Sequence, residues 1–186
     1  EEVALKKKMM ASEKELDSFA EFTPKEELFD KLVKTIYEYH PSTDISLIRK
    51  AYELADSCHE GQLRKSGEPY ICHPLCVAII LAELELDKET IIAGILHDVI
   101  EDTACSPEEI KDIFGEEVLL LVDGVTKLTQ LQYSKDKVDV QAENLRKMFL
   151  AMAKDIRVIL IKLADRLHNM RTMEYQSPAK QIEKSR

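Results

Sequence analysis

Residues 87–102, DKETIIAGILHDVIED, decide the fold class of this chain. Asp87 is a favoured N-cap residue, and the apolar residues behind it predict a helix from Lys88 to about Asp102. The apolar stretch before it predicts another helix at His73–Leu84, and a loop of turn formers at Arg64–Tyr70 precedes that one.

Helical periodicity extends outward on both sides. Apolar residues recur on one face between Leu47 and Cys58, and Gly61 ends that helix. Thr23-Pro24-Lys25-Glu26 predicts an N-cap at Thr23, and Ser106-Pro107-Glu108-Glu109 predicts a capping box whose helix stops at Gly115. Further helices are expected near residues 116–128, 138–152 and 155–175.

The composition supports a single helical domain. The chain has 186 residues, 45% of them hydrophobic, with only five glycines and six prolines, which suits one core and few turns. We predict an all-α fold, a compact multi-helix bundle. Residues 1–22 are expected to be a charged leader, partly ordered or disordered, and residues 23–186 one domain, with the chain a piece of something longer.

Charge and cysteine usage narrow the function classes. The formal net charge is −9, which argues against direct nucleic-acid binding through a broad basic face, so an anionic substrate would need local cations or a metal. The four cysteines lack framework spacing, which favours a reducing compartment and hence the cytoplasm. The sequence has no apolar run of the roughly 20 residues that span a bilayer, so no membrane association is expected.

A polar pair, His97 and Asp98, interrupts the apolar run of the deciding stretch. At about 100° per residue, His97 and Glu101 differ by about 40°, as do Asp98 and Asp102, so a continuous helix would place the four on one polar edge. A satisfied core histidine beside a frayed helix end is the plain alternative. An ionised Asp98 among apolar neighbours needs compensation, and a metal cation would supply it.

Two other segments carry polar groups among apolar residues. Asp165, Asn169 and Thr172 form a polar stripe at i, i+4 and i+7, which an internal network with Arg166 or Arg171 would explain equally well. His168, three residues after Asp165, is a candidate for supporting a ligand from behind. His73 begins a predicted helix, where alone it would be a cap or core residue. Zinc at Cys72, His73 and Cys76 is disfavoured because paired C-x-x-C spacing is absent, and His40 and His59 are expected to be surface or packing residues.

Taken together, these segments resemble the HD phosphohydrolase superfamily. More narrowly, HEGQLRKSGEPYICHP, HDVIEDT, FGEEV, LVDGVTKL and QAENLRKMFLAMAKDIRVILIKLADRLHNMRTM are similar to the hydrolase domain of the RelA/SpoT alarmone enzymes. The resemblance runs from about Ile48 to Pro178. It implies an HD-domain fold and metal-dependent hydrolysis of guanosine tetra- and pentaphosphate, (p)ppGpp, to GDP or GTP and pyrophosphate, which controls the alarmone level in the stringent response.

The resemblance also implies roles for particular residues. Manganese(II) would be the cofactor, although the donor set also suits iron, cobalt or zinc. Glu101 and Asp102 would act on the attacking water and the leaving group, and which of them is the base stays open. Arg64, Lys65 and Ser66 match the loop that meets guanine and phosphates, and Asn169 and Thr172 match positions on the nucleoside side. The implied metal ligands are His73, His97, Asp98 and Asp165.

Two further hypotheses follow from the same residues. One is an HD phosphohydrolase acting on another nucleotide, and the other is a non-catalytic (p)ppGpp-sensing module that regulates a synthetase domain. Such a synthetase domain, a pyrophosphokinase, is an expected intramolecular partner in a longer bifunctional chain. The intact His97-Asp98 and Glu101-Asp102 pairs favour catalysis over sensing.

Overall fold

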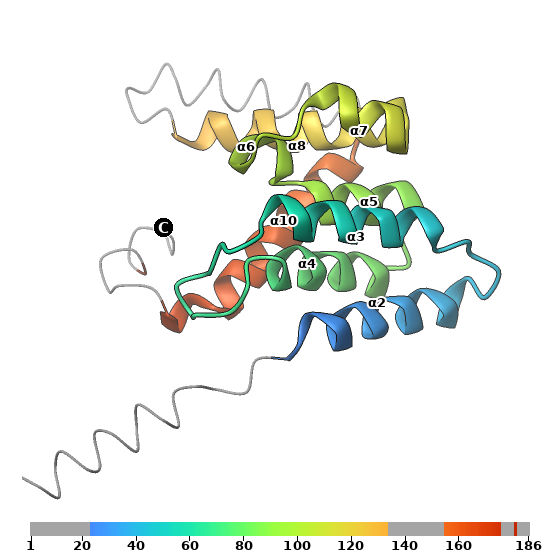
Figure 1. Cartoon of the computed structure of the whole chain (residues 1–186), viewed down its shortest axis with the longest axis horizontal. Helices are drawn as coiled ribbons and strands as arrows, with labels where there is room; N and C mark the ends of the chain where they lie inside the picture. The colour runs from blue at the N-terminus through green and yellow to red at the C-terminus, as the bar shows by residue number, and fades with distance from the viewer. Residues whose placement is uncertain (1–22, 134–154, 176–180, 182–186) are drawn as a thin grey trace, which may run out of the picture.

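The regular elements are helical throughout the part of the chain described by the computed structural model, residues 23–133, 155–175 and 181 (Figure 1). The all-α prediction is confirmed. The leader 1–22 and the helix predicted at 138–152 lie outside the described residues. The elements are α2 (Lys25–Tyr39), α3 (Ser46–Cys58), α4 (Cys72–Glu83), α5 (Lys88–Leu96), α6 (Val99–Asp102), α7 (Pro107–Phe114), α8 (Glu116–Tyr133), α10 (Arg157–Arg171) and a 3₁₀ turn (Met173–Tyr175).

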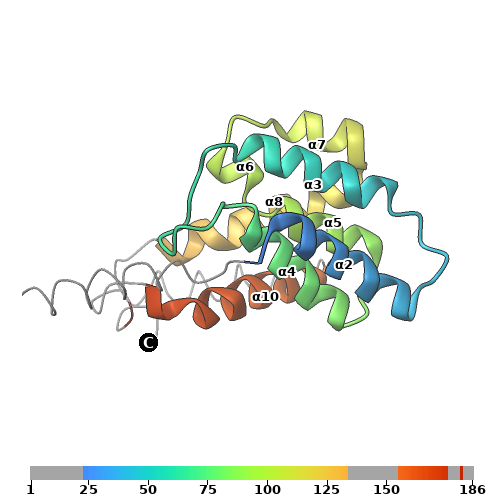
Figure 2. The ribbon, with the colours of Figure 1, turned by 60° about the horizontal axis from the view of Figure 1, so that its bottom comes forward.

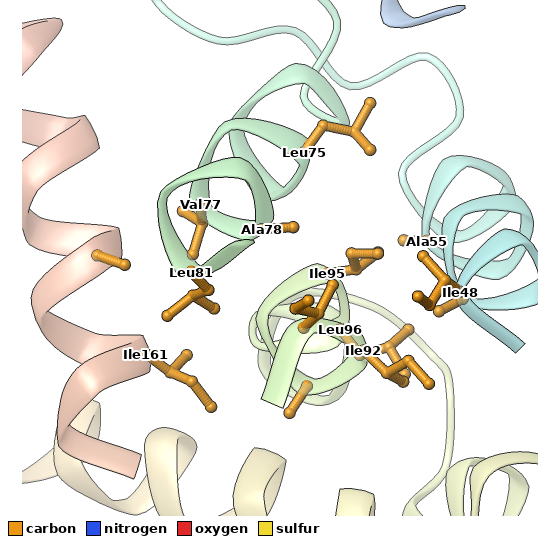
Figure 3. Packing of buried hydrophobic residues seen from close by; sticks show 14 of the residues in the cluster. Ile48, Ala55, Leu75, Val77, Ala78, Leu81, Ile92, Ile95, Leu96 and Ile161 are labelled. Carbon is orange, nitrogen blue, oxygen red and sulfur yellow. The ribbon is translucent and has the colours of Figure 1, made fainter. Parts of the chain in front are cut away.

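Helices α4 and α5 form the centre of the bundle. They pack against each other, α4 also contacts α2 and α10, and α5 also contacts α3 and α8 (Figure 2). Both helices are apolar on nearly all sides, as expected for helices surrounded by protein. In Figure 3, Ile92 of α5 lies toward Ile48 of α3, and Leu81 of α4 lies toward Ile161 of α10. The first residues of α4 and the last of α5 are therefore held deep in the molecule.

The contact between α4 and α5 is close because of Gly94. A Cβ atom at this position would lie 2.5 Å from Leu81 Cδ1, well inside van der Waals contact. Leu81 is fully buried, so its side chain would have to shift within a packed core to admit a methyl group. Gly94 thus lets α4, which carries His73, and α5, which His97 directly follows, approach each other.

Helix boundaries follow local signals with two exceptions. The capping box at Ser106 and Glu109 is present, and Gly115 ends α7 with φ of 92°, as predicted. The N-cap predicted at Thr23 is wrong: Pro24 has ψ of 146°, its carbonyl accepts from the amide of Leu28, and α2 begins at Lys25.

The second exception is the helix predicted across residues 88–102, which is broken at His97–Asp98 into α5 and α6. His97 Nδ1 lies 2.7 Å from the carbonyl oxygen of Gly94. In a continuous helix that carbonyl would accept from the backbone N–H of Asp98, so the imidazole competes with the helical hydrogen bond. The prediction of one helix was wrong for this reason.

The remaining boundaries differ modestly from the predicted ones. Helix α8 continues to Tyr133 beyond the predicted end at 128, and the helix predicted at 155–175 is α10 followed by the 3₁₀ turn. The loop predicted at Arg64–Tyr70 is confirmed, with a single bridge between Leu63 and Pro69. Among the described residues, no helix combines the length and apolar character needed to cross a membrane.

Candidate metal centre and its cavity

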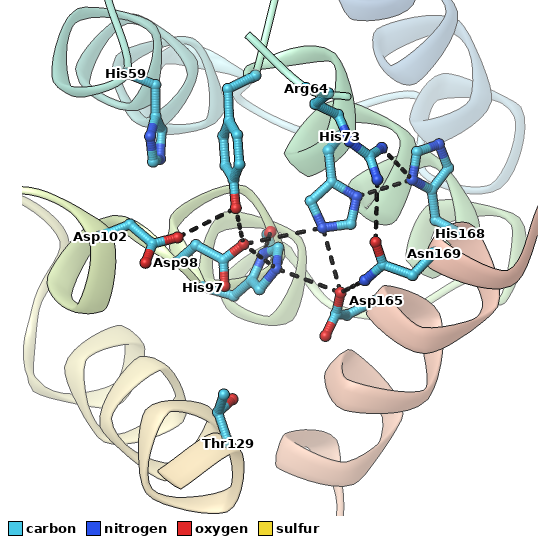
Figure 4. A network of polar contacts seen from close by, with 12 residues as sticks. His59, Arg64, His73, His97, Asp98, Asp102, Thr129, Asp165, His168 and Asn169 are labelled. Atoms are coloured by element: carbon cyan, nitrogen blue, oxygen red, sulfur yellow. Dashed lines mark hydrogen bonds and ion pairs between the residues drawn. The ribbon is translucent and has the colours of Figure 1, made fainter. Parts of the chain in front are cut away.

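Three side chains from distant parts of the chain converge at the centre of the bundle. His73 begins α4, His97 follows α5 and Asp165 lies on α10, and one ligand atom of each is within 4.8 Å of the others (Figure 4). His73 Nε2 is 3.2 Å from Asp165 Oδ1, and His97 Nε2 is 3.9 Å from it. The packing of α4 on α5 and α10 brings them together.

Asp98 lies beside this group, at the break between α5 and α6. Its Oδ2 atom is 3.0 Å from His97 Nε2 and 3.9 Å from His73 Nε2. Tyr70 donates a 2.7 Å hydrogen bond from its hydroxyl to the same oxygen. Asp98 therefore points one carboxylate oxygen at both imidazoles, from the more exposed side of the group.

The tautomer of His73 follows from its neighbours. Arg64 Nη1 lies 3.1 Å from His168 Nδ1, and because a guanidinium can only donate, this nitrogen is an acceptor. His73 Nδ1, 2.8 Å from the same atom, must then carry the proton and donate. Burial, with the nearby charges of His73 and Arg64, lowers the pKa of His168 to about 3, which keeps it a neutral acceptor. His73 Nε2 is left with its lone pair facing Asp165.

His97 is oriented in the same way by the main chain. The carbonyl of Gly94 can only accept, so His97 Nδ1 donates to it. His97 Nε2 is buried and has no hydrogen-bond partner among the described residues. A buried polar nitrogen without a partner is costly unless something else fills its place.

These observations fit a cation. Two imidazole nitrogens and two carboxylate oxygens face one another at distances where lone pairs repel unless positive charge lies between them. Nitrogen and oxygen donors in this mixture suit a divalent transition metal. The donor atoms thus fit the divalent metal that the sequence predicted, and among the described residues His73, His97 and Asp165 form a triad that could hold such an ion.

The titration behaviour of the cluster shows the same need for positive charge. Burial opposes protonation of His97, but the charges of Asp98 and Asp165 outweigh it and raise its pKa to about 9. Burial acts to raise the pKa of Asp98, yet the neighbouring His97 and His73 hold it well below its usual range. Burial likewise acts to raise the pKa of Asp165, but the neighbouring His73, His97 and Lys162 outweigh it and lower the pKa.

Asp165 is held from both sides of its carboxylate. Asn169 donates from Nδ2 to Oδ1 at 2.6 Å, and Lys162 donates from Nζ to Oδ2 at 2.6 Å. Lys162 also donates to Thr129 Oγ1 at 3.0 Å, which connects α10 to α8. The polar stripe predicted on this helix is therefore an internal network around Asp165.

A cavity of about 270 Å³ opens beside the metal centre. Glu101 and Asp102, at the end of α6, line it. Partial burial and the charges of Asp102 and Asp98 raise the pKa of Glu101. The other lining residues are Arg64, Tyr70, His73, Asp98, Thr129, Lys162, Asp165, Arg166, Asn169, Met170 and Met173.

Arg64 joins the loop to α10. Its Nη2 atom donates to Asn169 Oδ1 at 3.0 Å and to Thr172 Oγ1 at 3.3 Å, so the arginine that completes the stripe is Arg64 and not Arg166 or Arg171. Thr172, Lys65 and Ser66 do not line the cavity; Ser66 Oγ instead donates to Glu68 Oε1 at 3.2 Å. Of the five residues expected to contact substrate, the structure brings Arg64 and Asn169 to the cavity wall.

Sequence reasoning missed Tyr70, Lys162 and Thr129. Tyr70 is half-buried and packs against His59, with ring centroids 4.4 Å apart, and its hydroxyl reaches both Asp98 and Asp102. Lys162 lies three residues before Asp165, a helical spacing that could have indicated a pair. Thr129 carried no sequence signal. His168, expected behind a ligand, contacts His73 directly.

Comparison with known proteins agrees with this geometry. A family model described as HD domain matches residues 51–186, and the chain therefore belongs to the HD domain family. A solved structure titled "A metazoan ortholog of SpoT hydrolyzes ppGpp and plays a role in starvation responses" aligns with a TM-score of 0.60 and 30% identity, covering 76% of this chain and 81% of that one.

Curated relatives place it further, in the RelA/SpoT family. The chain is 56% identical over 149 residues to a GTP pyrophosphokinase of Myxococcus xanthus, covering 79% of this chain and 20% of that protein. It is 54% identical over 153 residues to the bifunctional (p)ppGpp synthase/hydrolase SpoT of Escherichia coli K12, covering 82% and 22%. The chain thus spans about a fifth of the length of these relatives.

Proposed function

We propose that this domain hydrolyses the 3′ pyrophosphate of (p)ppGpp to give GDP or GTP and pyrophosphate, in a reaction that needs a divalent metal. The observation that carries the proposal is the convergence of His73, His97 and Asp165 beside a cavity lined by two further carboxylates. Within the described part of the chain, the buried Nε2 of His97 has no hydrogen-bond partner. SpoT relatives and the metazoan neighbour named for ppGpp hydrolysis support this substrate.

The metal ligands we propose are His73, His97, Asp98 and Asp165, with manganese(II) as the ion. When bound, such an ion supplies positive charge for phosphoryl oxygens and lowers the pKa of a water molecule. The protein orients these ligands before a metal binds. His168 and the carbonyl of Gly94 hold His73 and His97 in the Nδ1–H tautomer, and a hydrogen bond from Tyr70 orients Asp98. Asp98 stands outside the triad of mutually close atoms, so its role rests on its 3.0 Å approach to His97.

Glu101 is the proposed general base. The pKa of Glu101 is raised, which moves it toward neutral pH. A general base is most effective when its pKa lies near the working pH. Asp102 accepts a hydrogen bond from Tyr70 at 3.2 Å and is more constrained, which suits it to orient water or to assist the leaving group. Both line the cavity, so a reacting phosphate beside the metal centre is within their reach.

Recognition of the nucleotide is assigned to the loop and to α10. Arg64 presents a planar guanidinium at the cavity wall, held by Asn169 and Thr172, where it can stack on a base or meet phosphate. Lys65 and Ser66 lie next to it in the same loop and would approach a nucleotide from outside the cavity. The net charge of −9 makes these local cations necessary for an anionic substrate.

The proposed cellular setting follows from the relatives and from the cysteines. Two of the similar proteins are named as a pyrophosphokinase and a bifunctional synthase/hydrolase, so we propose an intramolecular synthetase domain in the parent protein. Cys58, Cys72, Cys76 and Cys105 are all free thiols, which suits the reducing cytoplasm. Control of the alarmone level would follow from hydrolysis there.

A turnover assay tests the function. The purified chain is incubated with ppGpp and manganese(II), and GDP, pyrophosphate and orthophosphate are quantified with and without chelator. Equal amounts of GDP and pyrophosphate, lost on chelation, are expected. Orthophosphate release from another nucleotide, with ppGpp untouched, would indicate a different HD phosphohydrolase; tight ppGpp binding without product in any divalent metal would indicate a sensing module.

A further inference from the structure

We propose that Lys162 is a positioning residue that restricts Asp165 to a single metal-facing oxygen. Lys162 Nζ lies 2.6 Å from Asp165 Oδ2, while Asp165 Oδ1 is the oxygen that faces His73 Nε2 at 3.2 Å. The two oxygens of one carboxylate therefore have different partners. Oδ1 faces a histidine nitrogen and accepts from the neutral amide of Asn169 at 2.6 Å, whereas Oδ2 accepts from an ammonium.

The surroundings hold the ammonium in this place. The Lys162 side chain is only 14% exposed, and its second hydrogen bond, 3.0 Å to Thr129 Oγ1, anchors it on α8. Thr129 in turn donates from Oγ1 to the carbonyl of Val125 at 3.1 Å, so its hydroxyl is fixed by the helix. A lysine carries a flexible stem, and two anchored hydrogen bonds remove that flexibility.

This arrangement has a consequence for a cation held by Oδ1. A carboxylate can bind a metal through one oxygen or through both. The positive charge of the Lys162 ammonium beside Oδ2 opposes the approach of a cation to that oxygen. With Oδ2 occupied by Lys162, Asp165 offers one donor, which leaves more positions of the ion for water and substrate. Removing Lys162 would free the second oxygen, strengthen the hold on the ion and reduce the positions open to reactants.

The alternative roles of Lys162 predict other results. If it only supported the fold or the ligand, its loss would weaken metal binding, because a carboxylate that loses its partner becomes less well oriented. If it contacted the substrate directly, its loss would raise KM while leaving the metal affinity unchanged. The proposed role is the one that combines undiminished metal affinity with a lower kcat.

The experiment compares Lys162→Met and Lys162→Arg with the unaltered chain. Manganese(II) affinity is measured by isothermal titration calorimetry without substrate, and kcat and KM for ppGpp are measured separately. For Lys162→Met we expect the metal dissociation constant to be equal or up to about 10-fold lower, kcat to fall about 10–100-fold, and KM to stay within about 3-fold. Lys162→Arg should regain most of kcat, because it keeps a cation beside Oδ2.

A matched control is Lys127→Met, which removes an exposed lysine of α8 paired with Asp123 and should match the unaltered chain in all three quantities. Weakened metal binding or a raised KM with unchanged kcat in Lys162→Met would overturn the proposal. Should that variant fail to fold by circular dichroism, Thr129→Val, which removes only the anchor of Lys162, must show the same pattern more weakly or the proposal fails.

The kinetic part rests on the proposed function, but the metal titration does not. Absence of ppGpp turnover by the unaltered chain would refute the function alone. In that case the calorimetry still decides the inference, because a weaker metal affinity in Lys162→Met contradicts it with no substrate present.

Discussion

Arg64 Nη2 donates a 3.0 Å hydrogen bond to Asn169 Oδ1, joining residues 105 positions apart in the chain. The amide of Asn169 then donates to Asp165, so the loop after α3 is connected to the metal centre through one side chain. Because an amide has one acceptor end and one donor end, Arg64 and Asp165 together fix which way the Asn169 group points. The recognition loop and the candidate metal site are therefore parts of one hydrogen-bonded unit.

Replacing Arg64 should affect substrate binding more than the metal. Arg64→Ala removes the guanidinium from the cavity wall, and we expect KM for ppGpp to rise about 10–100-fold with a small change in kcat. Loss of its partly buried hydrogen bonds should also lower the free energy of unfolding by about 1–3 kcal/mol. Steady-state kinetics and urea unfolding measure the two effects.

Arg171→Ala is the matched control for this prediction, since Arg171 is an exposed arginine near the end of the same helix that carries Asn169. It should leave KM and stability close to those of the unaltered chain. An Arg64→Ala protein with unchanged KM would show that the guanidinium serves only to tie the loop to α10.

Manganese(II) should raise the thermal stability of the chain. A ligand that binds only the folded state stabilises it by about 2.7 kcal/mol at 100 times its Kd, and for a domain of this size about 1 kcal/mol corresponds to 2–4 °C, so a rise in Tm of about 5–10 °C is expected. Asp98→Ala should abolish most of the shift and the turnover. The exposed Asp112→Ala provides the control, and an undiminished shift in Asp98→Ala would remove Asp98 from the ligand set.

The sequence predicted those structural features that depend on residues close together in the chain. The capping box at Ser106 and Glu109 is a local signal and is present as predicted, whereas the break at His97 depends on a side chain that takes the carbonyl of Gly94. Composition and periodicity were enough for an all-α bundle. They did not predict that the imidazole of His97 would replace the helical hydrogen bond to the carbonyl of Gly94.

Residues of the site could be predicted only where a sequence motif identified them. The segments holding His73, His97 and Asp165 could be related to one another through the family resemblance, because they are 92 positions apart at the extremes and no periodicity links them. Tyr70 and Lys162 act by contacts across helices, Tyr70 on Asp98 and Lys162 on Thr129. Such contacts are set by how helices pack, and one sequence does not show this.

The pH dependence of turnover should reflect Glu101. Burial and the neighbouring carboxylates raise its pKa, and only the ionised form accepts a proton, so activity is lost as the pH falls through this raised value. The acidic limb of kcat should therefore lie above the usual range of a glutamate. Glu101→Gln should keep manganese(II) affinity, lose about 10²–10⁴-fold in kcat and lose this limb; a limb that persists unchanged would exclude Glu101 as the base.

The close approach of α4 and α5 can be tested at Gly94. Gly94→Ala places a methyl group 2.5 Å from Leu81 Cδ1, and overpacking of this kind should lower the free energy of unfolding by about 1–3 kcal/mol. A double-mutant cycle with Leu81→Ala checks the cause, because the shortened side chain makes room for the methyl group. Equal destabilisation by Gly94→Ala in both backgrounds would show that the contact is not responsible.

Tyr70 offers the most selective test of how the metal centre and the carboxylate pair are connected. Its hydroxyl has one hydrogen, lies 2.7 Å from Asp98 Oδ2 and 3.2 Å from Asp102 Oδ2, and stays protonated because burial and the charge of Asp98 raise its pKa. Tyr70→Phe removes that hydrogen bond and keeps the ring packed against His59. In this variant Asp98 would retain its contact with His97 but lose its hydrogen-bond donor, so we expect metal affinity to weaken by less than about 10-fold. We expect kcat to fall about 10-fold or more, because Asp98 and Asp102 lose their common partner. Calorimetry and kinetics on the same preparation separate the two effects, and a variant with full kcat would show that the hydroxyl contributes only to packing at the rim of the cavity.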